Sequence, residues 1–168
     1  MSDQTIFYTV ARRSFATISL VTLPDKTIAL VRDIHRYGSD AKWKFIGGEG
    51  LLGETPIRGA VRENEEESGI LIPENLLIPY GGPIAKYNYD IFRFTAELQE
   101  MPKDCILKRR ADEGEDTALW TALEIRQMAD DLASPLPWEN RDFLRMHYEL
   151  FYEKLRELAP DQLLSAAA

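Results

Sequence analysis

The sequence contains very little cysteine and histidine: among its 168 residues there are one Cys and two His. A lone thiol, Cys105, can form no internal disulfide, and a thiolate metal cluster needs several such ligands. The chain also starts without the basic and then apolar stretch that is typical of a secretory signal. From these absences we expect a protein of the reducing, cytoplasmic compartment.

Long apolar runs and an excess of basic residues are missing as well. The longest apolar stretches, such as Ala16–Leu23, are interrupted by Thr and Ser and fall short of the ~20 residues that span a bilayer. Lys and Arg number 20 against 28 Asp and Glu, a formal charge of −8, which disfavours binding to duplex nucleic acid or to an anionic membrane. A phosphate-bearing ligand would therefore need divalent cations or a local group of basic residues.

The composition nevertheless supplies enough apolar material for a folded core. Hydrophobic residues make up 45% of the chain and charged residues 29%, close to ordinary globular usage, and we expect a single domain over residues 1–168. Residue alternation predicts strands at Ser14–Leu23 and Thr27–Arg32, joined as a hairpin, and at Phe45–Ile46, Tyr87–Leu98 and Ala118–Ala122. Helical periodicity predicts helices at Pro56–Ser68, Leu123–Leu132 and about 137–159. This mixture indicates an α/β fold.

A glycine-rich segment leads into the most informative of these helices. Four glycines lie between positions 47 and 53. Thr55 and Pro56 follow, and they are a favoured N-cap and a favoured first helical residue. Gly69 is a typical residue at a helix C-terminus. The local chemistry therefore predicts both ends of this helix.

Three carboxylates gather on one side of the helix. At ~100° per residue, Glu63, Glu66 and Glu67 share a face that is separate from the apolar stripe. Ionised acids at this spacing repel one another. A divalent cation compensates that repulsion, and Mg²⁺ prefers carboxylate oxygen, water and substrate phosphates as ligands. Arg62 can reach Glu66 at i+4 or pair with Glu54, and either contact would hold an acid in one orientation.

These residues resemble the signature of the Nudix hydrolase family, G-x(5)-E-x(7)-R-E-U-x-E-E-x-G-U, in which U is a bulky apolar residue. The match covers residues 48–70 and comprises Gly48, Glu54, Arg62, Glu63, Glu66, Glu67, Gly69 and Ile70. Asn64 departs from it, because the family usually has an apolar residue there. On the helical projection Asn64 faces the core, so its amide needs a hydrogen-bond partner. Ile46 also stands where many relatives have a proline.

The resemblance implies a fold, a reaction and a metal. The implied fold is an α/β/α sandwich with a mixed β-sheet, a long C-terminal helix and the acidic helix beside a phosphate cleft. The implied chemistry depends on Mg²⁺, with Mn²⁺ as a substitute, and Glu66 and Glu67 are the leading metal ligands. Glu63 is then a third ligand or the group that orients a metal-bound water, and the Gly48 carbonyl is a further candidate ligand. In this interpretation Glu54, Arg62 and Gly69 are structural.

The general base and the substrate contacts fall outside the signature. Family members differ in the source of the base, and the candidates here are Glu97, Glu113, Glu115 and Asp116. We favour Glu115, in the polar segment before Trp120. Basic residues that could meet phosphate are Arg32, Arg36, Lys44 and Arg93, and aromatic residues that could stack on a base or sugar are Tyr37, Trp43, Tyr87 and Tyr89. Among these we select Arg36, Tyr37, Trp43 and Arg93 as substrate-binding residues.

Three functions follow from the resemblance. The leading one is hydrolysis of the pyrophosphate bond in a nucleoside diphosphate linked to another moiety, such as a nucleotide sugar, an ADP-ribose-like compound or a dinucleotide. The enzymatic alternative is a MutT-like pyrophosphohydrolase of damaged nucleoside triphosphates. The third is a non-catalytic module that senses a nucleotide or binds a protein. The apolar stripe of the last helix covers the sheet or forms a homodimer, and periodicity does not separate these.

Overall fold

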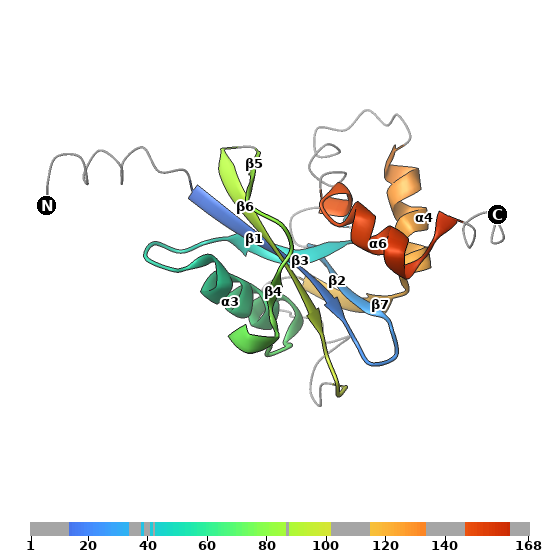
Figure 1. Cartoon of the computed structure of the whole chain (residues 1–168), viewed down its shortest axis with the longest axis horizontal. Helices are drawn as coiled ribbons and strands as arrows, with labels where there is room; N and C mark the ends of the chain where they lie inside the picture. Colours follow the sequence, from blue (N-terminus) through green and yellow to red (C-terminus); the bar gives the residue numbers. More distant parts are fainter. Residues whose placement is uncertain are drawn as a thin grey trace, which may run out of the picture.

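The computed structural model describes residues 14–33, 38, 41, 43–86, 88–101, 115–133 and 147–161. The strands are β1 (Ser14–Thr22), β2 (Ile28–Asp33), β3 (Lys44–Glu49), β4 (Ile78–Pro79), β5 (Ile84–Lys86), β6 (Tyr89–Glu97) and β7 (Glu115–Trp120). The helices are α3 (Pro56–Ser68), the 3-10 turn η2 (Glu74–Leu76), α4 (Ala122–Ala133) and α6 (Tyr152–Leu158) (Figure 1). Within these residues, no helix is both long enough and apolar enough to cross a bilayer.

The strands form one mixed sheet in the order β4-β6-β1-β3-β2-β7, with β5 also paired to β6. The central pair β1 and β6 is parallel, in register from Ser14 opposite Tyr89 to Thr22 opposite Glu97. The other pairings, including those of β3 with β1 and β2, are antiparallel. The predicted hairpin of β1 and β2 is confirmed at its turn, where the two strands pair antiparallel at Thr22 and Ile28. Beyond the turn, β3 lies between the two strands because it pairs with both.

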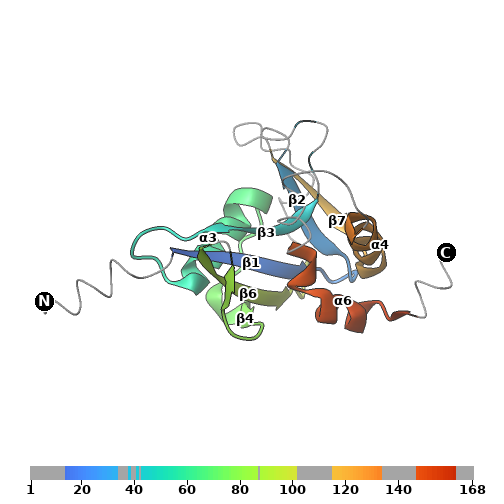
Figure 2. The same ribbon diagram turned by 90° about the horizontal axis from the view of Figure 1, so that it is seen from above.

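Helices cover both faces of this sheet. Along β1, Ile18 and Leu20 join a cluster with Ile125 of α4 and Leu155 of α6, whereas Val21 joins a second cluster that includes Ala60 of α3. Because successive strand residues point to opposite faces, α3 packs on one side of the sheet and α4 and α6 pack on the other (Figures 1 and 2). The expected α/β/α sandwich with a mixed sheet is confirmed.

The helix α3 has the bounds that its sequence predicts. The Oγ1 atom of Thr55 accepts a hydrogen bond from Arg58 N at 3.4 Å, and Pro56 is the first helical residue. At the other end, Gly69 has a φ of 76° and its N–H donates to Glu65 O. A left-handed residue of this kind ends the helix and is best provided by glycine.

Two strands start at places that the sequence pattern did not predict. The segment expected as one strand over Tyr87–Leu98 is the second half of a hairpin, in which β5 turns back through Asn88 (φ 63°) and β6 begins at Tyr89. Asparagine is one of the few side chains that tolerates this backbone region. The strand expected at Ala118–Ala122 begins earlier, at Glu115, because it pairs with β2 as far as Asp33.

The long C-terminal helix expected at about 137–159 is also corrected. Within residues 147–161, the helical segment that includes His147 is interrupted at Leu150 and Phe151, and α6 starts at Tyr152. The interruption has a tertiary cause, since Arg93 Nη1 donates to the Leu150 carbonyl at 2.8 Å. Phe151 is fully buried, with its ring 4.9 Å from that of Phe45. Residues 137–146 of the expected helix lie outside the described residues.

Candidate active site

Arg62 is the centre of the acidic edge of α3. Its Nε donates to Glu54 Oε2 at 2.9 Å and its Nη2 to Glu54 Oε1 at 3.0 Å, a two-point pairing that holds the pKa of the Glu54 carboxyl below its ordinary value. Arg62 Nη2 also donates to the Glu49 carbonyl at 2.9 Å, and Glu54 Oε1 accepts from Leu51 N at 3.0 Å. These contacts tie both sides of the glycine-rich loop to the helix.

The same guanidinium also contacts two of the signature acids. Arg62 Nη1 donates to Glu63 Oε1 at 2.8 Å and to Glu66 Oε2 at 3.0 Å. Both partners proposed for Arg62 from the sequence, Glu54 and Glu66, are therefore engaged at once. The positive charge of the Arg62 guanidinium offsets the repulsion between Glu63 and Glu66. About half of the Glu66 side chain remains exposed.

Glu63 lies against the backbone of β3. A Cβ atom added to Gly48 would be 2.6 Å from Glu63 Oε1, so the absence of a side chain at this position makes the approach possible. Burial raises the pKa of Glu63, and the neighbouring Arg62 opposes that rise. The Glu63 carboxyl thus lies close to the loop, and neighbouring protein charges neutralise its negative charge only in part.

Glu67 is the most deeply buried of the three acids, with 7% of the residue exposed. Its Oε2 accepts a hydrogen bond from Gly47 N at 3.1 Å, and Lys44 Nζ lies 3.4 Å from its Oε1. Burial raises the pKa of Glu67 to about 7 despite the nearby ammonium of Lys44. Sequence reasoning placed Lys44 among the phosphate contacts and missed this pair. The alternation of residues along β3 could have indicated this contact, because Lys44 lies on the same face of the strand as Gly48 of the signature.

Asn64 occupies the core side of α3, as its position on the helical projection predicts. It is 1% exposed, and its Nδ2 donates to Ser19 Oγ of β1 at 3.4 Å. The departure from the signature at this position is therefore accommodated in part: the amide nitrogen has a polar partner on the sheet, whereas Oδ1 is buried without a hydrogen-bond partner among the described residues.

The acidic edge fits a divalent cation by its donor chemistry. Carboxylate oxygens are the ligands that Mg²⁺ and Mn²⁺ favour, and burial leaves Glu63 and Glu67 with raised pKa values that a cation would lower. The acids are not gathered into a ready-made cage: within the described part of the chain, no three Asp, Glu, His or Cys side chains stand in a metal-holding group. Glu67 is turned to Lys44 and Gly47, while Glu63 and Glu66 are turned to Arg62.

Comparison with known proteins decides the family. The NUDIX domain model matches residues 12–145. The chain belongs to the Nudix family. It is accordingly a Nudix hydrolase, an enzyme class that acts on pyrophosphate bonds, generally uses divalent metal ions and takes nucleotide-type small molecules. We refer to α3 below as the Nudix helix.

Solved structures share the fold. A structure from work on MutT of the fish pathogen Aliivibrio salmonicida and of Vibrio cholerae matches with a TM-score of 0.55 and 15% identity, covering 84% of this chain and 99% of its own. MutT from Methanosarcina mazei Go1 matches with a TM-score of 0.50 and 19% identity, covering 84% of this chain and 94% of its own. A comparison with curated protein sequences finds no significant match.

The favoured general base of this Nudix hydrolase is in a strand and not in a loop. Glu115 is the first residue of β7 and pairs through its backbone with Asp33. Two residues further along, Thr117 Oγ1 donates to the Glu67 carbonyl at 3.1 Å, so β7 runs beside the end of the Nudix helix. Of the other candidate bases, Asp116 is in the same strand, Glu97 ends β6, and Glu113 lies outside the described residues.

The residues selected for substrate binding divide into two groups. Arg36 and Tyr37 lie outside the described residues, as does Tyr87. Arg93 donates to the Leu150 carbonyl and stacks on Tyr80 at 4.9 Å. Trp43 packs against Trp120 with ring centres 5.6 Å apart, and Arg32 covers it at 4.7 Å. Both of these described residues contribute to packing on the α4 and α6 face, and their contact with substrate stays a prediction.

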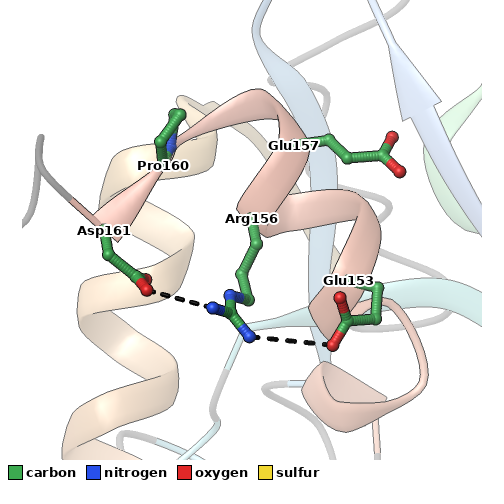
Figure 3. A pocket seen from close by; sticks show the side chains of 5 residues that line it. All are labelled: Glu153, Arg156, Glu157, Pro160 and Asp161. Carbon is green, nitrogen blue, oxygen red and sulfur yellow. Dashed lines mark hydrogen bonds and ion pairs between the residues drawn. The ribbon is translucent and has the colours of Figure 1, made fainter.

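A surface pocket lies away from the acidic edge. It is lined by Glu153, Arg156, Glu157, Pro160 and Asp161 at the end of α6 (Figure 3). This helix packs on the opposite face of the sheet from the Nudix helix (Figures 1 and 2). The ion pairs of Arg156 with Asp161 and Glu153 join these lining side chains to one another. None of the signature acids Glu63, Glu66 and Glu67 lines this pocket.

Proposed function

We propose that this Nudix hydrolase cleaves the pyrophosphate bond of a nucleoside diphosphate linked to another moiety, with Mg²⁺ as its metal and Mn²⁺ as a substitute. The observation that supports this most strongly is the arrangement of the acidic edge: one arginine holds Glu63 and Glu66, and the buried Glu67 lies against the glycine-rich strand. A nucleotide sugar, an ADP-ribose-like compound and a dinucleotide all present the required bond.

The signature residues divide the work in this proposal. Glu66 and Glu67 would hold the cation, with Glu63 as a third ligand or as the group that orients a water, and the Gly48 carbonyl as a further ligand. Bound there, the cation would neutralise the pyrophosphate and make the attacking water more acidic. Arg62 and Glu54 keep the loop and the acids in place through the contacts described above.

The chemical step is a hydrolysis. A water oxygen forms a bond to one phosphorus, and the bond from that phosphorus to the bridging oxygen breaks. The proton of the water passes to a base, for which we propose Glu115, and the bridging oxygen leaves with the other phosphate. The products are a nucleoside monophosphate and the phosphorylated second moiety.

A MutT-like reaction on nucleoside triphosphates is the second candidate. It is supported by the two MutT structures, which share this fold over nearly their whole length. The products separate the two candidates, because the MutT-like reaction releases inorganic pyrophosphate together with a nucleoside monophosphate.

The test is an assay of the purified chain with Mg²⁺ on nucleotide sugars, dinucleotides and nucleoside triphosphates, with the products identified. We expect Glu66→Gln and Glu67→Gln to lose about 100-fold or more in turnover, since even groups that only orient metal ligands contribute 10–100-fold. Glu65→Gln is the matched control, because Glu65 is an exposed residue of the same helix outside the specified signature positions. Equal turnover by all variants would contradict the metal-helix mechanism. No turnover on the whole panel would contradict the substrate class and favour a nucleotide-binding module.

A further inference from the structure

Lys44 is a partly buried cation outside the Nudix signature. It is the first residue of β3, and 16% of its side chain is exposed. Its ammonium is paired with Glu67, with Nζ 3.4 Å from Oε1. Charges are rarely removed from water without a partner, because the loss of hydration is unfavourable. The pair therefore places both side chains in a defined geometry.

Glu67 is held from three directions. Lys44 Nζ contacts Oε1, and the N–H of Gly47, in the same strand, donates to Oε2 at 3.1 Å. From β7, Thr117 Oγ1 donates to the Glu67 backbone carbonyl at 3.1 Å. A carboxylate contacted at both oxygens cannot rotate freely, yet each oxygen has about two lone-pair sites and keeps one for another ligand. Glu67 is thus fixed in orientation while still able to bind a cation.

Two basic side chains contact the three acids. Arg62, a signature residue, donates to Glu63 and Glu66, whereas Lys44 donates to Glu67. We propose that Lys44 is a positioning residue that holds Glu67 in the orientation needed for metal binding. This inference rests on the proposed function, and it assigns a role to a residue that precedes the signature.

The experiment measures the affinity of the protein for Mn²⁺ alone, from the free-ion signal in electron paramagnetic resonance. We expect Lys44→Met to weaken Mn²⁺ binding by about 10-fold or more, in the range found when partners of metal ligands are removed. Lys44→Arg, which keeps a cationic donor, should recover most of the affinity. Lys154→Met is the control, since it removes a partly buried ammonium from α6, on the other face of the sheet.

A double-mutant cycle tests whether Lys44 acts through Glu67. In a Glu67→Gln background, Lys44→Met should weaken Mn²⁺ binding no further, because the group that Lys44 positions is already lost. Thermal unfolding in the absence of metal checks that each variant is folded. If Lys44→Met does not fold, Lys44→Gln, which keeps a neutral donor, takes its place and is expected to weaken binding in the same way.

The outcomes separate this inference from the proposed function. Wild-type affinity in Lys44→Met, or an equal loss in the Glu67→Gln background, would overturn the role of Lys44 while leaving the metal site intact. A wild-type protein that does not bind Mn²⁺, or a Glu67→Gln variant that binds it as well as wild type, would overturn the proposed function itself.

Discussion

Glu67 is the residue whose charge state most directly connects the fold to the metal binding that we propose. Burial raises its pKa to about 7, so the carboxyl is largely protonated below that pH and ionised above it. An acid whose pKa is higher in the folded state than in the unfolded state stabilises the protein while protonated, and this contribution is lost as the pH rises from the ordinary value of 4.5 to about 7. A bound cation would offset the loss, because it binds the ionised form.

The first prediction follows from this competition between protons and metal. The rise in melting temperature caused by Mg²⁺ should be larger at pH 8 than at pH 6, because at pH 6 the cation must displace a proton from Glu67. Thermal unfolding with and without Mg²⁺ at the two pH values measures the difference. In Glu67→Gln the pH dependence of the shift should be reduced, and an equal shift at both pH values in wild type would contradict the role of Glu67.

The second prediction concerns two adjacent glycines of β3. A Cβ at Gly47 would stand 2.1 Å from the Thr17 backbone oxygen of β1, whereas a Cβ at Gly48 would meet the flexible end of Glu63 at 2.6 Å. Gly47→Ala should therefore lower the melting temperature, since the backbone of β1 or β3 must move to make room for the methyl group. Gly48→Ala should remain close to wild type in stability but lose turnover, because Glu63 is displaced. The reverse assignment of the two effects, seen in unfolding and activity assays, would contradict this account.

At the scale of single elements, the Nudix helix could be predicted in full and the last helix could not. Thr55, Pro56 and Gly69 act through contacts within a few residues of the chain, so local chemistry determines both ends of α3. The break at Leu150 depends on Arg93, which is distant in sequence. Periodicity alone carries no information about such a partner.

The third prediction concerns the attachment of α6 to α4. Arg126 of α4 is buried, and it donates to the Ala159 carbonyl at 2.5 Å and to Asp161 at 2.6 Å. Arg126→Met should lower the free energy of unfolding by about 2–3 kcal/mol. The variant loses two hydrogen bonds donated by a charged group, one to the buried Ala159 carbonyl and one to the Asp161 carboxylate. Urea denaturation measures this cost.

Arg156 provides the matched control for that measurement. It also pairs with Asp161 (Figure 3), at 3.0 Å, but its side chain is 44% exposed. Ion pairs of this kind contribute about 1 kcal/mol or less, so Arg156→Met should have a small effect. Equal losses for the two variants would show that burial of Arg126 does not matter for the attachment of α6.

At the scale of the whole molecule, the sequence predicts the layers but not the order of the strands. The alternation in β1 and β2 correctly indicates strands joined by a turn, yet beyond that turn β3 lies between them, because the pairing of each strand depends on the whole sheet. The same limit applies to the site. The signature locates Glu63, Glu66 and Glu67, but the contact between Lys44 and Glu67 depends on how β3 lies beside α3. Likewise, the polar sequence around Glu115 did not predict that β7 begins there. The strand begins at Glu115 because this residue pairs with Asp33 of β2.

The central claim is that the acidic edge of the Nudix helix binds a divalent cation beside the glycine-rich strand. The most direct measurement is anomalous diffraction from crystals soaked in Mn²⁺ with a non-hydrolysable nucleoside diphosphate derivative. We predict an anomalous peak for Mn²⁺ within coordination distance of carboxylate oxygens of Glu66 and Glu67, with the pyrophosphate of the ligand adjacent. A peak elsewhere, or acids that keep only Arg62 and Lys44 as partners at saturating Mn²⁺, would contradict the account.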